Sequence, residues 1–295
     1  MPDVTITSAA AFIPEIWANA ALLELRANMV LSQLVTKDTD VASFVRGDIL
    51  HIPVPGTFVA NDKVANTAVQ LQVPSDGEVT VTLNKHKEAS VLIEDIAKAQ
   101  SSQDLMSRYV RHMVRPIAEA IEKDLFSLYA SLTTTGGVGA TDLTGTSIRA
   151  ARKLLNDNKV PLENRSFVLS TKDEISLLGD TTLQSFFAFS QPEAVQEGRI
   201  GRVYGFDIYV SQLAPFSTNQ KNLAFSPEFA ILAMRGLPMN EAPNVQQLTI
   251  QDPKSGLVLR QTVSYSPNFL GVQVTIDVLY GFSVLRNLAG VLMIS

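Results

Sequence analysis

The histidines are the residues of this chain best suited to hold a metal ion or to move a proton. The 295-residue sequence contains three, His51, His86 and His112, and they are far apart. None is accompanied by a second ligand at a spacing typical of a zinc site. We therefore expect structural or surface roles for all three and predict no metal site.

Three glycines, Gly198, Gly201 and Gly205, are spaced like a loop that cradles phosphate groups. A dinucleotide-binding loop must follow a strand and open a helix, whereas these glycines precede an apolar run that reads as a strand. A turn before that strand is the better interpretation.

The acidic pair in Asp38-Thr-Asp40 has the spacing of the first ligands of a calcium-binding loop. The glycine and the glutamate that complete such a loop do not follow at the required positions. We expect a solvated loop.

Arg108, Arg111 and Arg115 form a short basic stripe on a predicted helix, followed by Glu119 and Glu122. Ion pairing between subunits or plain solvation explains the stripe better than contact with nucleic acid. The net charge of −5 and the pI near 5.3 also argue against strong nucleic-acid binding, which depends on lysine and arginine neutralising phosphates.

Motifs of known enzymes are missing, since no G-x-S-x-G, Walker or H-E-x-x-H pattern occurs. The chain has no cysteine, which excludes disulfides and thiolate metal sites and fits a reducing cytoplasm. We predict no enzymatic activity and no cofactor. A hydrolase or transferase with an unfamiliar site is an alternative, which would elute as a small oligomer.

Size and composition predict a substantial core divided between two lobes with extensions. Hydrophobic residues make up 46% of the chain and charged residues 18%, which is below the usual quarter. A smaller part of the protein surface than usual is therefore expected to be exposed to water. No run approaches the ~18 apolar residues that span a bilayer, and Glu15 and Glu24 interrupt any signal-like segment.

A long amphipathic helix is predicted from Gln103 to Leu132, spanning roughly 45 Å at 1.5 Å per residue. Its apolar residues recur three or four positions apart, which lines one face of a helix. Ser102 is placed to cap its start, and Pro116 should bend it without ending it.

The segment before this helix reads as a projecting arm. Residues 78–83 and 89–93 have strand character, and residues 48–54 are a plausible partner strand whose Pro53 fits only an edge or an end. The stretch between, 55–74, is too long for a tight turn and too polar for a core. We expect a loop that becomes ordered on another subunit.

The first 46 residues form an apolar arm with one predicted helix after Pro14, and they include the only tryptophan, Trp17, and Leu22. An isolated monomer would struggle to bury these side chains. The alternative is that this helix packs on its own domain.

The rest of the chain mixes helices and strands without regular βαβ repetition, which predicts an α+β fold. A flexible connector is expected at 133–139. The predicted helices are 147–156, one beginning near Thr171, and 226–234; the predicted strands are 165–169, 206–210, 257–265 and 271–279, with a final apolar run at 288–294.

Several segments in this order resemble the major capsid (coat) protein of tailed double-stranded DNA bacteriophages. They are Ser90-Val-Leu-Ile-Glu-Asp-Ile96 before the long helix, Phe167-Val-Leu-Ser-Thr171, Gly201-Arg-Val-Tyr-Gly-Phe-Asp-Ile-Tyr-Val-Ser211, and Val274 to Val284. Encapsulin shells and the floor of the herpesvirus capsid share this fold. The resemblance covers nearly the whole chain, and the order of the segments carries it.

The resemblance implies a fold with an N-terminal arm, an extended β-hairpin loop, a spine helix, a peripheral domain and an axial domain. Placed on this sequence, these parts are the N-arm 1–46, the extended loop 47–92, a peripheral domain 93–179 with the spine helix 103–132, an axial domain 180–250, and return strands 251–295. The implied function is a structural subunit of an icosahedral capsid, self-assembling into hexamers and pentamers that enclose double-stranded DNA. The alternative is an encapsulin-type shell that encloses cargo enzymes.

The partners implied are copies of the chain itself, a separate scaffolding protein and a portal, with DNA enclosed but not tightly bound and no membrane. The expected location is the virion, with assembly in the host cytoplasm. Because the sequence begins with Met1 and a short arm, we also expect no maturation cleavage. The candidate residues for contacts between subunits are Trp17, Leu22, Phe58, Lys63, Arg108, Arg111 and Arg115.

Some members of this family cross-link a lysine of the extended loop to an asparagine of a neighbour. Lys63 could serve chemically, but the sequence identifies neither an acceptor nor an activating carboxylate. We therefore make no prediction about cross-linking.

Overall fold

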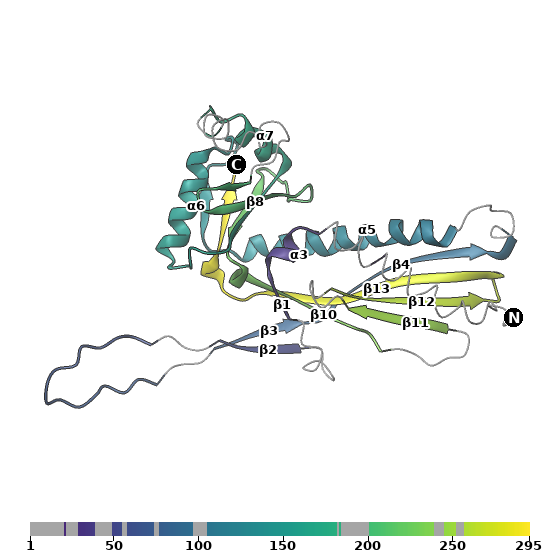
Figure 1. Ribbon diagram of the computed structural model, residues 1–295, viewed down its shortest axis with the longest axis horizontal. Helices are drawn as coiled ribbons and strands as arrows, with labels where there is room; N and C mark the ends of the chain where they lie inside the picture. The colour runs from purple at the N-terminus through teal and green to yellow at the C-terminus, as the bar shows by residue number, and fades with distance from the viewer. Residues whose placement is uncertain are drawn as a thin grey trace, which may run out of the picture.

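A long helix lies along a six-stranded sheet and forms the larger part of the molecule (Figure 1). The structure is a computed structural model, which describes residues 21, 29–38, 49–54, 58–73, 77–96, 105–181, 183, 201–238, 245–251 and 257–295. Helix α5 (Leu105–Phe126) continues into the 3-10 helix η2 (Ser127–Ser131). The strand order is β1-β10-β13-β12-β11, with β4 paired to β13. These strands are β1 (Thr36–Asp38), β4 (Lys85–Glu94), β10 (Ala230–Arg235), β11 (Val245–Gln251), β12 (Val258–Ser266) and β13 (Gly271–Val284).

Strand β13 organises this first sheet because it is 14 residues long and has neighbours on both sides. On one side it pairs antiparallel with β4 over residues 271–280. On the other side, β12 pairs with 271–277 and β10 with 279–284, so these two strands lie end to end. One strand near the end of the chain therefore joins three segments that are distant in sequence.

The second sheet has the order β5-β14-β9-β6-β8-β7 and forms a separate lobe with two helices (Figure 1). Ser170 caps helix α7 by accepting a hydrogen bond from the backbone N–H of Asp173. The elements are β5 (Thr135–Gly137), α6 (Gly145–Asp157), β6 (Arg165–Leu169), α7 (Thr171–Leu178), β7 (Arg202–Val203), β8 (Phe206–Val210), β9 (Lys221–Phe225) and β14 (Gly290–Ile294).

The two sheets are joined where the chain passes from β9 to β10 and from β13 to β14. The first passage contains the 3-10 helix η3 (Pro227–Phe229) and the second contains η4 (Asn287–Ala289). The backbone N–H groups of Leu285 and Arg286 both donate to the carbonyl of Phe229, at 2.9 and 3.2 Å. Hydrogen bonds therefore hold the two passages to one another.

This division into two sheets differs from the predicted domain boundaries. Residues 135–178 were grouped with the long helix, but β5 and β6 pair within the sheet that also contains β8. Residues 230–235 and 245–251 were grouped with the axial segment, but as β10 and β11 they pair alongside β13 and β12. The sheet to which a strand belongs is decided by its pairing with strands distant in sequence, and such pairing leaves no signal in the local sequence.

The predicted α+β class and most of the predicted elements are confirmed. Helix α5 follows the expected period, and Pro116 lies inside it without ending it. The predicted capping residue Ser102 lies outside the described residues. Strand β6 has the predicted bounds 165–169, and the glycine-rich turn precedes β8 as expected, with Gly205 at φ +84°.

Two predictions about secondary structure are wrong. Residues 230–235 form strand β10 and not a helix, because this run is almost entirely buried between β1 and β13. A short, wholly buried apolar run shows the period of neither structure. The expected flexible connector contains β5, which pairs parallel with β14.

The predicted hairpin at the base of the arm is confirmed. Strand β2 (Ile49–Val54) pairs antiparallel with β3 (Gly77–Thr82), and Pro53 lies opposite Glu78. Among the described residues these strands form a sheet of their own, so Pro53 lies on an edge strand, where proline is tolerated. The hairpin carries the loop that extends away from the body (Figure 1).

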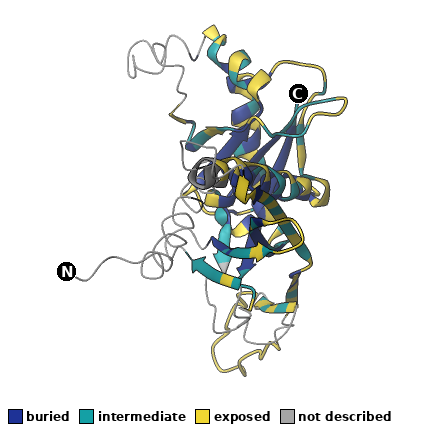
Figure 2. Ribbon diagram, turned by 90° about the vertical axis from the view of Figure 1, so that its right-hand side faces the viewer, coloured by how far each residue is buried: buried dark blue, intermediate teal, exposed yellow. Residues whose placement is uncertain are grey.

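The hydrophobic core is continuous through both lobes, and Figure 2 shows it as the buried interior of the two sheets. Ile117, Ile121 and Leu125 of α5 pack with Val274 and Ile276 of β13 in this core. The four-residue helix α3 (Leu31–Leu34) adds Leu31 to it. No helix in the described part of the chain is long and apolar enough to cross a membrane.

Candidate assembly surfaces

Residues 58–73, which we call the projecting loop, place apolar side chains in solvent. Phe58 is 69% exposed, Leu71 92% and Val73 95%. Val59, Val64 and Val69 are also largely exposed. Several large apolar side chains exposed on one short segment favour a binding role for it. Phe58, a candidate contact residue, therefore lies where another subunit could reach it.

The hairpin below the loop is fixed to the body by a small second core. Val81 and Leu83 pack there against Ile231 and Ala233 of β10. The approach of β3 to β13 is close at Gly281, where an added Cβ would lie 2.2 Å from the carbonyl oxygen of β3's last residue. The base of the arm is thus anchored by packing that only glycine permits.

Two side chains shape the projecting loop itself. The Gln72 amide accepts a hydrogen bond from the Val59 N–H at 2.9 Å and donates one to the Val59 carbonyl. The Lys63 ammonium donates to the Val64 carbonyl at 2.8 Å and to both the carbonyl and the hydroxyl of Thr67. The ammonium group of Lys63, the second candidate contact residue in the loop, therefore makes its hydrogen bonds within its own turn.

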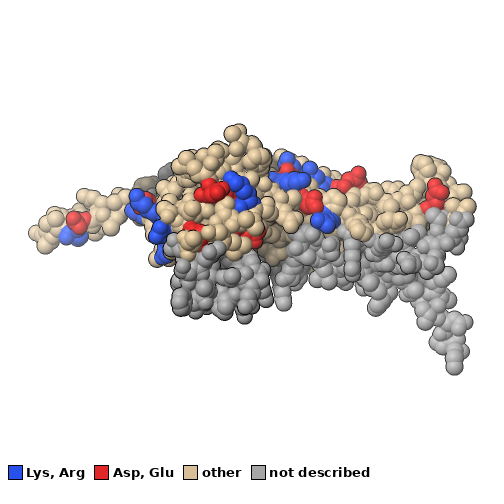
Figure 3. Space-filling view, turned by 90° about the horizontal axis from the view of Figure 1, so that it is seen from above, with Lys and Arg blue, Asp and Glu red and all other residues tan. Residues whose placement is uncertain are grey.

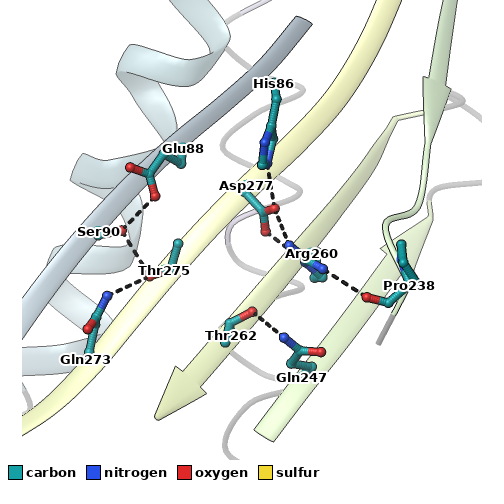
Figure 4. Close-up of polar contacts among 10 residues, drawn as sticks. All are labelled: His86, Glu88, Ser90, Pro238, Gln247, Arg260, Thr262, Gln273, Thr275 and Asp277. Carbon is teal, nitrogen blue, oxygen red and sulfur yellow. Dashed lines mark hydrogen bonds and ion pairs between the residues drawn. The ribbon is translucent and has the colours of Figure 1, made fainter. Parts of the chain in front are cut away.

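The side of the first sheet that faces away from α5 is polar (Figure 4). Asp277 of β13, 3% exposed, accepts from Arg260 Nε at 3.1 Å and Nη2 at 2.7 Å, and it also contacts His86 Nε2 at 2.8 Å. The same arginine donates to the carbonyl of Pro238 at 2.9 Å. This cluster joins three strands, so His86 has a structural contact.

Residues 29–38, which we call the strap, are held against the long helix by a buried carboxylate. Glu122 of α5 is 1% exposed and accepts from the backbone N–H groups of Leu31 at 2.7 Å, Val30 at 3.3 Å and Ser32 at 3.5 Å. Burial raises the pKa of Glu122 to about 7, and these hydrogen bonds oppose the shift. Beyond α3 the strap pairs with β10 as β1.

Sequence reasoning noted Glu122 only as an acidic residue beside the arginine stripe and did not predict its burial. The signal that could have shown its burial is its position, four residues after buried Ala118 and three before buried Leu125. A carboxylate within an apolar stripe must find hydrogen-bond donors, and here the start of the strap supplies them. Asp277 was missed because its partners lie on other strands, and Gln72 because its partner lies on the opposite leg of the loop.

The remaining candidate residues are only partly described. Arg115 is exposed and pairs with Glu119 at 3.2 Å, one helical turn away. Arg108 and Arg111 lie on α5, and their side chains are outside the described residues. Trp17 and Leu22, together with the predicted N-terminal helix, also lie outside them.

Metal-ligating side chains do not cluster in the part of the chain that the structure describes. No group of three histidine, aspartate or glutamate side chains there could hold a metal ion. An open cleft of about 540 Å³ lies beside the end of α5 and is lined by Lys123, Tyr129 and Pro215 among others. The face seen in Figure 3 interleaves acidic and basic side chains without a broad field of one sign.

Comparison with known proteins adds a family and a fold. A family model described as phage capsid protein matches residues 77–272, from β3 to the start of β13. No curated protein matches the sequence. Three similar solved structures come from Mycobacterium phage Che8 (19% identity, 90% of this chain and 90% of that chain, TM-score 0.69), the capsid of cyanophage P-SCSP1u (16%, 90% and 87%, 0.65) and a virus-like particle from Pyrococcus furiosus (11%, 95% and 98%, 0.55).

Proposed function

This chain belongs to the phage capsid protein family, and from that premise we propose how it builds a shell. It is a structural subunit of an icosahedral phage capsid, and an encapsulin-type compartment is not favoured. We propose that copies assemble into hexamers and pentamers, with the projecting loop and the N-arm of each subunit lying on its neighbours. Trp17, Leu22 and Phe58 are the apolar contacts proposed for these two reaching elements.

The observation that carries this proposal is the projecting loop. It exposes Phe58, Leu71 and Val73, and no residue of the loop belongs to the continuous core of the body. Leaving them in water is unfavourable by roughly 25 cal/mol per Å² of apolar surface, and a second copy can cover them. Many small contacts of this kind are individually reversible, so that misplaced subunits can dissociate before a shell closes.

The two sheets provide the domains of this subunit. We propose that the first sheet with α5 is the peripheral domain and that the second sheet with α6 and α7 is the axial domain. The paired passages at η3 and η4 join them. This assignment follows the strand pairing in placing residues 133–179 with the axial domain, and β1 and β4 with the peripheral domain. The parts of the N-arm and the extended loop outside these strands keep their proposed reaching role.

The charge distribution supports enclosure of DNA without tight binding. The net charge is −5, and the described residues on the face seen in Figure 3 form no continuous basic field that could neutralise phosphates. DNA that does not adhere to the wall can move during filling and release. We further propose a separate scaffolding protein, a portal, and assembly in the host cytoplasm.

Deleting residues 55–74 and closing β2 to β3 with a short turn tests the proposal. The hairpin base keeps its small core, so the subunit should remain folded and soluble but fail to close shells. Electron microscopy and size-exclusion chromatography measure the outcome. The matched control is Gln70→Ser, which alters an exposed residue of the same loop and leaves its apolar side chains in place.

Normal shells from the deletion variant would refute the reaching role of the loop. A wild-type chain that elutes only as a small oligomer under assembly conditions would refute self-assembly altogether. DNA inside purified particles, in place of protein cargo, is the expected content.

A further inference from the structure

The projecting loop has a defined shape although almost no backbone ladder supports it. Within residues 58–73 the structure gives one hydrogen bond between backbone groups, from the Thr67 N–H to the Val64 carbonyl at 3.4 Å. The loop also has little contact with the body, since its residues are all exposed. Its conformation must therefore depend on side chains within the loop.

The Gln72 side chain takes the place of one pair of backbone hydrogen bonds between the two legs of the loop. Its carboxamide pairs with both the N–H and the carbonyl of Val59 on the opposite leg, as a strand residue would with its backbone. Because a side chain spans the gap, the two legs lie further apart than paired strands, and Figure 1 shows the loop open between them. Leu71 and Val73 flank Gln72 and are the most exposed large apolar residues in the described part of the chain.

Lys63 closes the tip. Three oxygen atoms, the carbonyls of Val64 and Thr67 and the Thr67 hydroxyl, converge on its ammonium group. The Thr67 hydroxyl also donates to the Val64 carbonyl at 2.8 Å. Asn66 completes the turn in the left-handed region at φ 63°, a conformation that asparagine tolerates better than most residues. The positive charge of the Lys63 ammonium group offsets the repulsion between these oxygen atoms and so allows them to lie close together.

We infer that the projecting loop has its shape in the free subunit and docks on a second copy as a preformed element, with Lys63 and Gln72 as positioning residues. This inference rests on the proposed function, because it concerns how the loop meets its neighbour. A preformed loop loses less conformational entropy on docking than one that folds on its partner. The rate at which subunits assemble therefore depends on polar side chains that contact only the loop itself.

The discriminating variant is Gln72→Leu. It removes both hydrogen bonds to Val59 and makes the loop more apolar. If apolar contact alone drives docking, this variant assembles as well as wild type or better. A preformed loop predicts the opposite, with a subunit concentration for half-maximal assembly on the order of tenfold higher. The matched control is Gln70→Leu, which adds the same apolar group to the same leg and removes no hydrogen bond described in the loop.

Lys63 supplies an independent pair of variants. Lys63→Met keeps an unbranched side chain that is one atom shorter and removes the cation, and it should also slow assembly. Lys63→Arg keeps a cation with several donors and should restore much of the loss. Light scattering records assembly, and limited proteolysis of unassembled subunits records the shape of the loop. Cleavage within 58–73 should be slow in wild type and in the Gln70 control, and faster in Gln72→Leu and Lys63→Met.

Shells that form equally well from Gln72→Leu and Gln70→Leu overturn the inference and leave the proposed function intact. Equal cleavage of the wild-type and Gln72→Leu loops in unassembled subunits also overturns it. A wild-type chain that forms no shells counts against the proposed function, and the proteolysis comparison then still decides whether the loop is preformed.

Discussion

Replacing Glu122 by glutamine should make the subunit more stable at alkaline pH and change it little at acid pH. The glutamine oxygen can still accept from the N–H groups of Val30 and Leu31, so the two shorter bonds to the strap are kept. Its amide nitrogen replaces the oxygen that accepts from the Ser32 N–H at 3.5 Å, so only this longest of the three bonds is lost. Glutamine therefore resembles the protonated glutamate in shape and in charge.

The magnitude follows from the pKa of Glu122, which burial raises from 4.5 to about 7 in the folded chain. The folded state binds this proton more tightly than the unfolded state does. The stabilising contribution is complete below pH 4.5 and is lost as the pH rises through 7. At about 1.4 kcal/mol for each pKa unit, the full loss for the wild type is about 3 kcal/mol. The substituted glutamine does not ionise, so the variant should exceed wild type by this amount at pH 8.

Urea unfolding of unassembled subunits, followed by circular dichroism at pH 4.5, 6 and 8, measures this difference. The control is Glu119→Gln, which removes an exposed ion pair worth less than about 1 kcal/mol and should give no such pH dependence. A difference between Glu122→Gln and wild type that stays constant from pH 4.5 to 8 would refute the buried, pKa-shifted carboxylate.

Two further substitutions test the contacts that fix the first sheet and the arm. Asp277→Asn should lower the free energy of unfolding by about 2 kcal/mol in urea denaturation, because the arginine of β12 loses a charged, buried acceptor. The control, Glu88→Gln on the exposed side of β4, should change the free energy of unfolding little. Equal effects of the two substitutions would contradict a stabilising role of the buried Asp277 carboxylate. Gly281→Ala should lower the free energy of unfolding by roughly 1 to 3 kcal/mol and reduce shell formation, because its Cβ would meet a β3 carbonyl at 2.2 Å. Gly77→Ala is its control, since there the nearest carbonyl is 3.8 Å away, and matching losses would show that close approach is not the cause.

The elements that sequence reasoning predicted well are those whose signals are local. The three- and four-residue spacing of α5, the alternation in β3 and the short apolar run of β6 each lie within one segment. The exposed loop was also predictable, because a long segment with few large apolar residues cannot form a core. The resemblance to the capsid family depended on the order of such segments.

The errors occurred where a distant partner decides the outcome. Strand β10 is sheltered by β1, which lies nearly 200 residues earlier, and by β13. Strand β5 owes its existence to β14 at the other end of the chain. The contact roles of Lys63 and Arg115 stay predictions, since the structure shows only that both side chains also form bonds within their own neighbourhood.

The amino-acid sequence alone determined the class of fold, the long helix, the projecting arm and the lack of any familiar catalytic motif. These properties follow from periodicity and composition, which act over a few residues. Only the tertiary structure decided which strands share a sheet, that Glu122 is buried under the strap, and that Gln72 and Lys63 shape the loop. The physical reason is that burial and hydrogen bonding are relations between segments, and their energies depend on distances that chain order does not specify.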